Sequence, residues 1–462
     1  MQDDSPKTAQ RIAPGIYRRA FDWRLSHATK ESIPKAAAAF VTLSSGDYLD
    51  IFEDYLAITR KRKGNRLAMA KAQLHLIEEL LIAQAAAKQY RKKLDELAPE
   101  LAKSQSLDDQ LHKDCETLER ELFLHRTHAN CIRSIGDGIA WRTLNYDRAA
   151  LRALSGKAVK QQILEQGTIN ELQEWSTAFD TGQGVAIFNA LTNWLAVGDI
   201  TLVKNDQSVE IVEVKSSNVD SGRITRQKQQ MRDVSDLLKN GKGTLEGQQI
   251  SIVRLDARPE NDLLGLFALL EEAGRIGFAG GRINNCCYVE AFDFRVMGSA
   301  EVAWKQGIEQ MKKEVPAWST DNDFVVRMDS LDILAFTPNC APFSVFPFPA
   351  RMCIELLTGA KEYSCFLNLT ELGREFERHG WQVEKGPQEF VKEGARRDSP
   401  VFRLRKDRMH PEVPPADLMR IQMETIRPSV VIQTLEEILK RGPDAMGPAS
   451  LVVYEGERDI WD

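Results

Sequence analysis

The segment VGDITLVKNDQSVEIVEVKSS, residues 197–217, decides how the centre of this chain folds. Apolar residues lie on both sides of a polar stretch, a pattern that predicts two buried strands joined by a turn. Asp199 opens the first strand, and Glu213 and Lys215 lie near the end of the second. Because successive side chains on a strand alternate between faces, we expect Glu213 and Lys215 on one face and the flanking valines on the other.

These residue types suit a metal centre. Two carboxylates on neighbouring strands supply the oxygen ligands that Mg²⁺ (or Mn²⁺) prefers, and the carbonyl of Val214 can complete the set. A bound divalent ion activates a water and stabilises charge on a phosphate, while a nearby lysine orients the attacking water. We therefore expect Asp199, Glu213 and Val214 to be metal ligands and Lys215 to be catalytic.

An Asp, a variable gap and Glu-x-Lys together resemble the PD-(D/E)XK, or restriction-endonuclease-like, nuclease superfamily. In style the match is closest to its virus-type replication-repair branch, and it covers about residues 165–295. Gly198 stands where this family often has proline. The resemblance implies a mixed sheet flanked by helices and magnesium-dependent hydrolysis of phosphodiester bonds.

The stretch SGRITRQKQQM, residues 221–231, resembles the helix that follows Glu-x-Lys in this family. The resemblance implies that a glutamine of this helix faces the site; Gln227 is expected there, and Gln230 is the alternate. The basic neighbours Arg223, Arg226 and Lys228 are expected to contact a phosphate backbone, where cations supply affinity independent of sequence.

Family members often carry another acid on a helix before the Asp strand. Glu171 and Glu174 are the candidates, because they lie one turn apart on one predicted helix face. Thr168 and Glu171 also form a capping-box pattern, in which Glu171 would only satisfy the backbone at a helix start. Glu174 is therefore the expected site residue, with Glu171 left open.

Glu-x-Lys alone is a weak signal, since exposed hairpins often carry alternating charges, and a solvated structural hairpin is the alternative. The surrounding pattern favours the nuclease interpretation. A helix-like stretch, 185–196, precedes Asp199. Further strands are predicted at 249–255 and 287–295, with a helix at 261–275 between them, and we expect these strands to complete the mixed sheet.

The N-terminal part predicts a long antiparallel helical hairpin. An apolar seam repeats at three- and four-residue spacing over Leu67, Ala70, Leu74, Ile77 and Leu81, and a second helix opens near residue 106. Intramolecular packing is one use of this hairpin; self-association or binding of a partner protein is the other. Further on, Gly-Asp-Gly at 136–138 predicts a turn with Asp137 as a turn residue.

The C-terminal part predicts a helix over 368–380, followed by strands near 381–384 and 400–405. A helix followed by a basic hairpin is typical of a winged-helix module, so Arg403 and Arg405 are candidate nucleic-acid contacts. An ordinary α/β extension is the alternative.

Length and composition frame these predictions. For 462 residues with 43% hydrophobic residues, we expect an α/β protein of about three domains. These are a mainly helical domain with the hairpin (1–155), a mixed-sheet restriction-endonuclease-like core (156–314) and a C-terminal α/β extension (315–462). Seven cysteines without paired spacing argue against disulfides and zinc.

No apolar run is long enough for a membrane span or a signal peptide, so a cytoplasmic location without membrane contact is expected. The net charge of −6 means that nucleic acid would meet local basic surface. The expected function is a magnesium-dependent nuclease, with DNA as the favoured substrate and bacterial restriction or anti-phage defence as its setting. The alternative is a catalytically inactive, nuclease-derived scaffold or a nucleic-acid-binding interaction protein.

Overall fold

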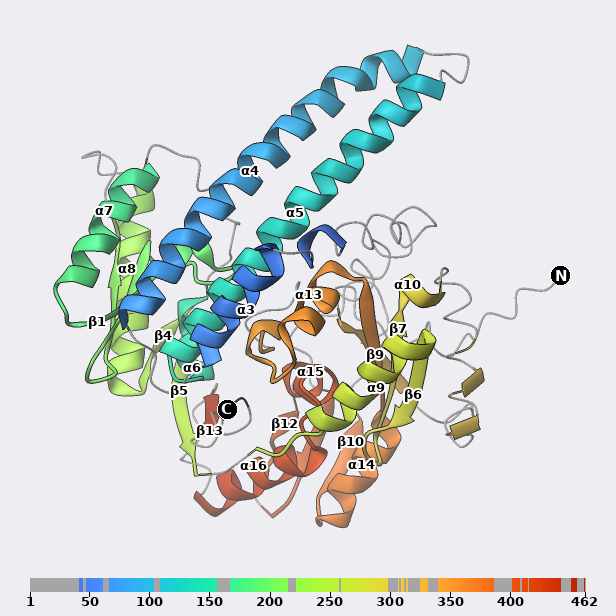
Figure 1. Ribbon diagram of the computed structural model, residues 1–462. Coiled ribbons are helices and arrows are strands. Elements are labelled where there is room, and N and C mark those ends of the chain that lie inside the picture. The colour runs from blue at the N-terminus through green and yellow to red at the C-terminus, as the bar shows by residue number, and fades with distance from the viewer. Residues whose placement is uncertain are drawn as a thin grey trace. The chain divides into compact units, whose positions relative to one another are not determined.

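The computed structural model describes residues 41–44, 47–60, 66–103, 109–155, 167–214, 222–256, 259–297, 306, 309–310, 313–314, 325–330, 340–385, 401–407, 409–413, 415–441, 450–454 and 461. The chain divides into two compact units (Figure 1). The hairpin unit holds residues 35–252 and 342–358, and the C-terminal unit holds residues 253–341 and 359–461. The expected boundary after residue 155 therefore falls inside the hairpin unit, and the one after 314 falls inside the C-terminal unit.

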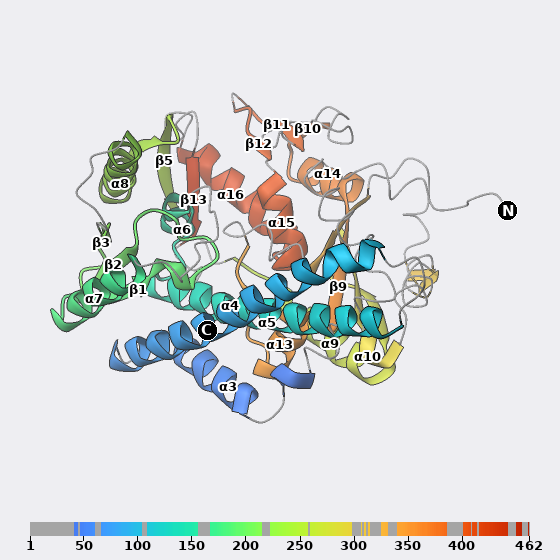
Figure 2. The same cartoon turned by 90° about the horizontal axis from the view of Figure 1, so that it is seen from above.

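Two long helices dominate the hairpin unit and pack against each other as the predicted hairpin (Figures 1 and 2). Its helices are α3 (Asp47–Arg60), α4 (Arg66–Lys103), α5 (Asp109–Thr143), α6 (Arg148–Leu154), α7 (Gly167–Asp180), α8 (Gly222–Asn240) and α13 (Ala350–Thr358). Short 3-10 helices are η2 (Asn189–Leu191) and η5 (Phe343–Val345).

The buried face of α4 is rotated from the predicted seam. Ala70 and Ile77 are buried as expected, but Leu67 and Leu74 are 50% and 46% exposed. The helix packs on α3, α5 and β1, and the residues that face this core include Gln73, which the apolar pattern could not select. The seam prediction was therefore wrong at two of its five positions.

The predicted turn at Gly-Asp-Gly is also wrong, because α5 runs through it to Thr143. The two glycines allow close packing instead. A Cβ added at Gly136 would overlap the carbonyl oxygen of Leu191 in η2, and one at Gly138 would lie 2.6 Å from Ser344 Oγ in η5. Neither glycine has a positive φ, so both serve helix packing rather than a reversal of the chain.

A three-stranded antiparallel sheet in the order β1-β2-β3 carries the decisive segment: β1 (Gly184–Phe188), β2 (Ile200–Lys204) and β3 (Val209–Val212). Val203 pairs with Val209 at the turn, which confirms the predicted hairpin. β2 is central and buried, whereas β3 is an edge strand of this sheet and only partly buried. Helix α7 packs on β1 and β2, and α8 packs on β3.

The stretch 185–196 was predicted as helix-like but begins as strand β1 and continues into η2. Side chains from two helices bind the outer edge of β1. Gln73 Nε2 donates to Ala186 O at 2.9 Å, Gln73 Oε1 accepts from Phe188 N at 3.0 Å, and Trp175 Nε1 donates to Ala186 O at 3.0 Å. These bonds replace a neighbouring strand, so the backbone stays extended.

The specific mixed sheet that the resemblance implied is not formed by the described strands. β5 (Gln248–Leu255) forms an antiparallel hairpin with β4 (Lys242–Leu245), and β7 (Cys287–Asp293) pairs with β6 and β9. Neither β5 nor β7 pairs with β1, β2 or β3. The α/β class is confirmed, but the strands predicted to extend one sheet belong to separate sheets.

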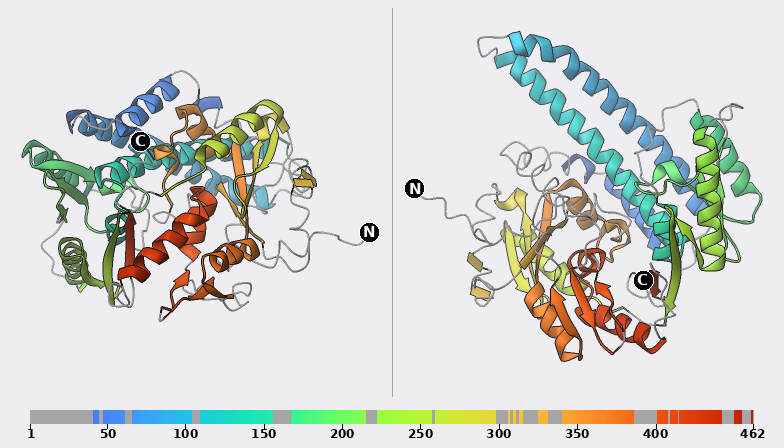
Figure 3. Two further views of the ribbon diagram at one scale, coloured as in Figure 1. Left: turned by 90° about the horizontal axis from the view of Figure 1, so that it is seen from below. Right: turned by 180° about the vertical axis from the view of Figure 1, so that it is seen from behind.

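The C-terminal unit centres on an antiparallel sheet in the order β6-β7-β9-β8. In Figure 3, β6 and β7 are yellow and β9 is orange. Helix α9 packs on β6 and β7, and α15 packs on β8 and β9. A second, small sheet has the order β10-β11-β12, and α14 packs on β10. The elements are α9 (Leu263–Ile276), β6 (Phe278–Arg282), α10 (Phe294–Met297), β8 (Val325–Asp329), β9 (Lys361–Asn368), α14 (Leu369–Arg378), β10 (Gln382–Lys385), β11 (Phe402–Arg405), β12 (Glu412–Val413), α15 (Pro415–Met423), α16 (Pro428–Arg441) and β13 (Ser450–Tyr454).

Two composition-based predictions concern the whole chain. The structure describes all seven cysteines, and each is a free thiol. Across the described ranges, no helix is both long enough and apolar enough to cross a bilayer.

Candidate nuclease-like site

Asp199 lies just before β2 and binds the end of β3. Its amide donates to Val212 O at 2.9 Å, and its Oδ2 accepts from Val214 N at 2.7 Å. These two contacts flank Glu213 in the sequence. The side chain of Asp199 is buried, with the residue 8% exposed. The hairpin register therefore places Asp199 against the backbone on either side of Glu213.

β3 ends earlier than predicted, at Val212, so Glu213 and Val214 follow the strand rather than lie within it. Glu213 is half-buried. Lys215, the predicted catalytic amine, lies outside the described residues.

Proline could not replace Gly198, the residue directly before Asp199. Its φ is +75°, a conformation that proline cannot adopt and other L-residues rarely do. A Cβ at this position would overlap Ile211 Cγ2 and lie 2.9 Å from Val212 O. The backbone thus passes over the end of β3 at a distance that only glycine permits.

Asn189 holds the loop that leads into Asp199, a role that no pattern in the sequence predicted. Its Nδ2 donates to the carbonyls of Val197 and Gly198, at 3.2 and 3.0 Å. Its Oδ1 accepts from Thr201 Oγ1 at 2.9 Å, and its amide donates to Asp199 O at 3.0 Å. Asn189 is 1% exposed, so these bonds form away from water and fix the path of the chain.

Asp137 holds the same loop from α5. Its Oδ1 accepts from Asn193 N and its Oδ2 from Asn193 Nδ2, both at 2.7 Å. Arg133, one turn earlier, is also buried; desolvation lowers its pKa and the charge of Asp137 partly restores it. Asp137 is therefore a positioning residue between helix and loop, not a turn residue. Its partner is 56 residues away in the sequence, which is why no local pattern revealed it.

The predicted glutamine and basic residues lie on α8, which packs on β3 and β4. Gln227 is half-buried, while its alternate Gln230 is exposed, so burial favours Gln227. Arg226 and Lys228 are exposed, as a surface for phosphates requires. Arg223 lies in the first turn of α8, where side chains are outside the described set.

The two candidate acids on α7 differ in exposure. Glu174, the expected site residue, is exposed, whereas Glu171 is half-buried. The helix begins at Gly167, so Thr168 is already inside it rather than at the capping position. Trp175, the next residue, is buried against β1, so Glu174 lies on the solvent side of the helix. Burial thus differs from the expected order, because Glu171 is the more buried of the two candidates.

Arg403 and Arg405 lie on β11 with their side chains exposed on one face. Arg403 is surrounded by acids: it pairs across the sheet with Glu384 on β10, and its Nε lies 3.3 Å from Glu412 Oε1 on β12. Arg405 pairs with Gln382 instead. The order of α14 and this antiparallel sheet agrees with the predicted helix and hairpin. Because acids lie beside Arg403 and not opposite Arg405, we expect Arg405 to offer more positive charge to a phosphate.

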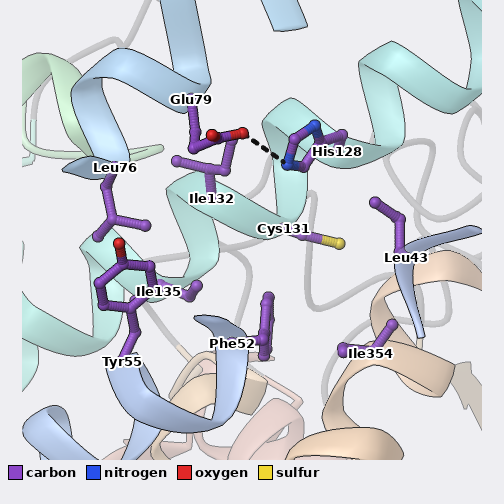
Figure 4. Close-up of a pocket in the computed structure, with 10 residues that line it drawn as sticks. All are labelled: Leu43, Phe52, Tyr55, Leu76, Glu79, His128, Cys131, Ile132, Ile135 and Ile354. Atoms are coloured by element: carbon purple, nitrogen blue, oxygen red, sulfur yellow. Dashed lines mark ion pairs between the residues drawn. The ribbon is translucent and has the colours of Figure 1, made fainter. Parts of the chain in front are cut away.

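Away from this site, a small apolar pocket lies among α3, α4, α5 and α13 (Figure 4). None of the predicted site residues lines it. Its polar pair is His128 and Glu79, with Nε2 and Oε2 3.7 Å apart. Burial, with a smaller effect of His125, lowers the pKa of His128 to about 4. The ring is therefore uncharged at neutral pH, and the contact is not an ion pair.

Over the described ranges, no three or more His, Cys, Asp or Glu side chains come together as a metal site. The donor set predicted around Asp199 would be smaller than that: two carboxylates and a backbone carbonyl. Its chemistry fits a hard divalent cation that keeps several waters, since such ions are commonly held by one or two carboxylates.

Comparison with known proteins found no matching family model, no matching curated protein and no matching solved structure.

Proposed function

We propose that this chain is a magnesium-dependent nuclease that hydrolyses phosphodiester bonds of nucleic acid, with DNA as its substrate. Asp199 and Glu213 would hold the ion together with the Val214 carbonyl. Lys215 would orient the attacking water, and Gln227 would support the site. A role in bacterial restriction or anti-phage defence is part of the proposal.

The observation that supports this proposal is the pair of hydrogen bonds between Asp199 and the end of β3. Its backbone and carboxylate bind the residues on either side of Glu213. A loop held by Asn189 and Asp137 delivers Asp199 to this place. Such rigid support is what a catalytic carboxylate needs, because small displacements of reacting groups cost large factors in rate.

The deciding experiment incubates purified protein with closed circular DNA, linear DNA and RNA, with and without Mg²⁺ or Mn²⁺. Metal-dependent cutting of the closed circle would establish internal cleavage of DNA. Loss of linear DNA alone would indicate an exonuclease, and cutting of RNA alone would correct the substrate. No cleavage of any substrate with either metal would refute the proposed activity.

The competing proposal is an inactive scaffold that keeps the nuclease-like hairpin for assembly. The buried bonds of Asp199 would serve that role equally well, because they also stabilise the loop. Calorimetric titration with Mg²⁺ and Mn²⁺ separates the two. A nuclease binds the ion and loses it when Asp199 is replaced by Asn, whereas a scaffold shows no binding that depends on Asp199.

We expect Arg405 to contribute more to DNA binding than Arg403. Replacing Arg405 with Ala should lower affinity and flatten the dependence of log K on log salt by about one phosphate contact. Arg403→Ala should change both much less, because Glu384 and Glu412 already compensate its charge. Fluorescence anisotropy with labelled duplex DNA over a salt series measures this. Unchanged binding by both variants would remove this sheet from the DNA-binding surface.

For the partner we propose a second copy of this chain, docked through the outer face of α4. Three apolar side chains lie along it: Leu67, Leu74 and Ile82, which are 50%, 46% and 60% exposed. Lys71 and Glu78 are exposed on the same face, at helical spacing between them. An antiparallel α4 pair would place Leu67 against Ile82 of the second copy, and Lys71 against its Glu78. Because the pair is symmetric, each of these contacts would form twice.

This charge symmetry gives a direct test. Lys71→Glu should weaken a dimer by about tenfold, because two opposite-charge pairs become like-charge pairs of modest energy each. Adding Glu78→Lys to that variant should restore the dimer, since both pairs are re-formed with their signs exchanged. Sedimentation equilibrium over a concentration series measures the dissociation constants. A monomer at every concentration, or a dimer that the single variant leaves unchanged, would contradict the proposal.

A further inference from the structure

A row of polar side chains crosses the sheet of the C-terminal unit. Glu290 on β7 pairs with Ser364 on β9, and Ser364 pairs with Asp329 on β8. Residues that pair directly across strands point to the same face. Tyr288 lies two residues from Glu290 on β7, and Arg327 lies two residues from Asp329 on β8. Both therefore point to this face as well.

One end of the row is fully bonded. Arg327 donates to Asp329 Oδ1 through Nε at 2.9 Å, and to Ser364 Oγ through Nη2 at 3.0 Å. Ser364 Oγ in turn donates to Asp329 Oδ1. β8 is the edge strand, and the side chain of Arg327 is 21% exposed. The row therefore reaches the surface at Arg327, with its charge matched by Asp329.

The other end is not bonded. Glu290 is 0% exposed, and neither of its carboxylate oxygens has a hydrogen-bond partner among the described residues. The hydroxyl of Tyr288 is buried and equally without one. Burial raises the pKa of Glu290 to about 8; Arg327 opposes this and Asp329 adds to it. The raised pKa favours the protonated form of Glu290 at neutral pH.

Stability alone does not explain an acid here. An unbonded buried carboxyl is costly, and the β7 residues on either side of it, Val289 and Ala291, are apolar core. Buried acids of this kind, with a shifted pKa and charged neighbours, are typical of functional sites. The row therefore points to a ligand that supplies what Glu290 lacks.

Charge and geometry define that ligand. With Glu290 and Asp329 both ionised and Arg327 positive, the row has negative charge in excess, and Glu314, whose charge also acts on Tyr288, adds to it. The ligand is therefore expected to be a cation. The two oxygens of a carboxylate accept two parallel N–H donors from a planar guanidinium, the strongest common pairing for this group. The Tyr288 hydroxyl, on the same face, offers a further acceptor.

We propose that Glu290, with Tyr288 and Ser364 beside it, binds a guanidinium group, from a small molecule or an arginine side chain, in exchange for the proton of the free carboxyl. This site is independent of the proposed nuclease activity. It predicts that affinity rises with pH as far as about pH 8, near the pKa of the free Glu290 carboxyl, and levels off above it.

Calorimetry with methylguanidinium as the probe tests the site on the full-length protein. Methylguanidinium should bind more tightly at pH 8.5 than at pH 6.5, whereas neutral urea should not bind. A Gly-Arg-Gly peptide as a second probe distinguishes the sources: binding tighter than methylguanidinium indicates a protein ligand, and weaker binding indicates a small molecule. No binding of either probe at pH 8.5, or equal binding of urea, would overturn the proposal.

Variants locate the binding. Glu290→Gln keeps the shape of the protonated carboxyl, so it should fold normally and bind methylguanidinium at least about tenfold more weakly, without pH dependence. Tyr288→Phe should weaken binding by a few-fold. Glu362→Gln is the matched control, because Glu362 lies on the same face two positions from Ser364 and outside the row. Unchanged binding by both Glu290→Gln and Tyr288→Phe would show that the probe binds elsewhere.

Discussion

Replacing Lys215 with Ala is expected to lower metal-dependent cleavage of DNA by about a hundred- to a thousand-fold, the usual loss when a group that stabilises the reacting atoms is removed. The fold should be unchanged, because Lys215 follows the last residue of β3 by three positions. Metal binding should also survive, since the proposed ligands are Asp199, Glu213 and the Val214 carbonyl. Plasmid cleavage and Mg²⁺ titration on the same preparation measure the two effects separately.

Asp199→Asn is the matching test of the proposed metal ligand. An asparagine can still accept a hydrogen bond from Val214 N through its Oδ1. The bond to the end of β3 is therefore kept, while the negative charge of the carboxylate is lost. We expect both metal binding and cleavage to disappear in a folded protein.

Glu210→Gln is the matched control for both variants. Glu210 lies on β3 three residues before Glu213, is exposed, and only pairs with Lys204 at 2.8 Å. Its removal should leave cleavage within about twofold, as expected for a surface pair of little energetic weight. Full activity of Lys215→Ala, or loss of activity in Glu210→Gln, would refute the assignment of roles.

Replacing Gly136 with Ala is expected to destabilise the hairpin unit by about 3 kcal/mol, the upper range for overpacking a close-packed site. In an ordinary helix this change would be stabilising, because alanine is the better helix former. Here the new methyl would overlap the backbone carbonyl of Leu191, which cannot rotate away as a side chain can. Urea unfolding followed by circular dichroism gives the free energy of unfolding.

Gly265→Ala in α9 supplies the contrast. A Cβ at Gly265 meets nothing within 4 Å, and its φ is not positive. We expect a gain of about 0.5–1 kcal/mol from helix propensity alone. If Gly136→Ala behaved like Gly265→Ala, then α5 and η2 would not pack as closely as the structure shows.

Because η2 leads towards Asp199, the Gly136 variant should also weaken Mg²⁺ binding. Gly265→Ala should leave Mg²⁺ binding unchanged.

Elements whose signal is local could be predicted from the sequence. Alternating apolar residues around a polar turn specified β2 and β3, and placed Asp199 and Glu213 at the ends that meet. Three- and four-residue spacing specified the helical hairpin of α4 and α5. These features follow from the period of the backbone, which neighbouring residues encode together.

Features that depend on distant partners could not be predicted in this way, because those partners meet only when the chain packs. The stretch at 185–188 became a strand because Gln73, more than a hundred residues earlier, bonds its outer edge. Gly-Asp-Gly at 136–138 stayed helical because η2 and η5 press against it. The strands β5 and β7 joined separate sheets for the same reason: strand periodicity selects a face but not a neighbour, and the neighbour is chosen only when the chain packs.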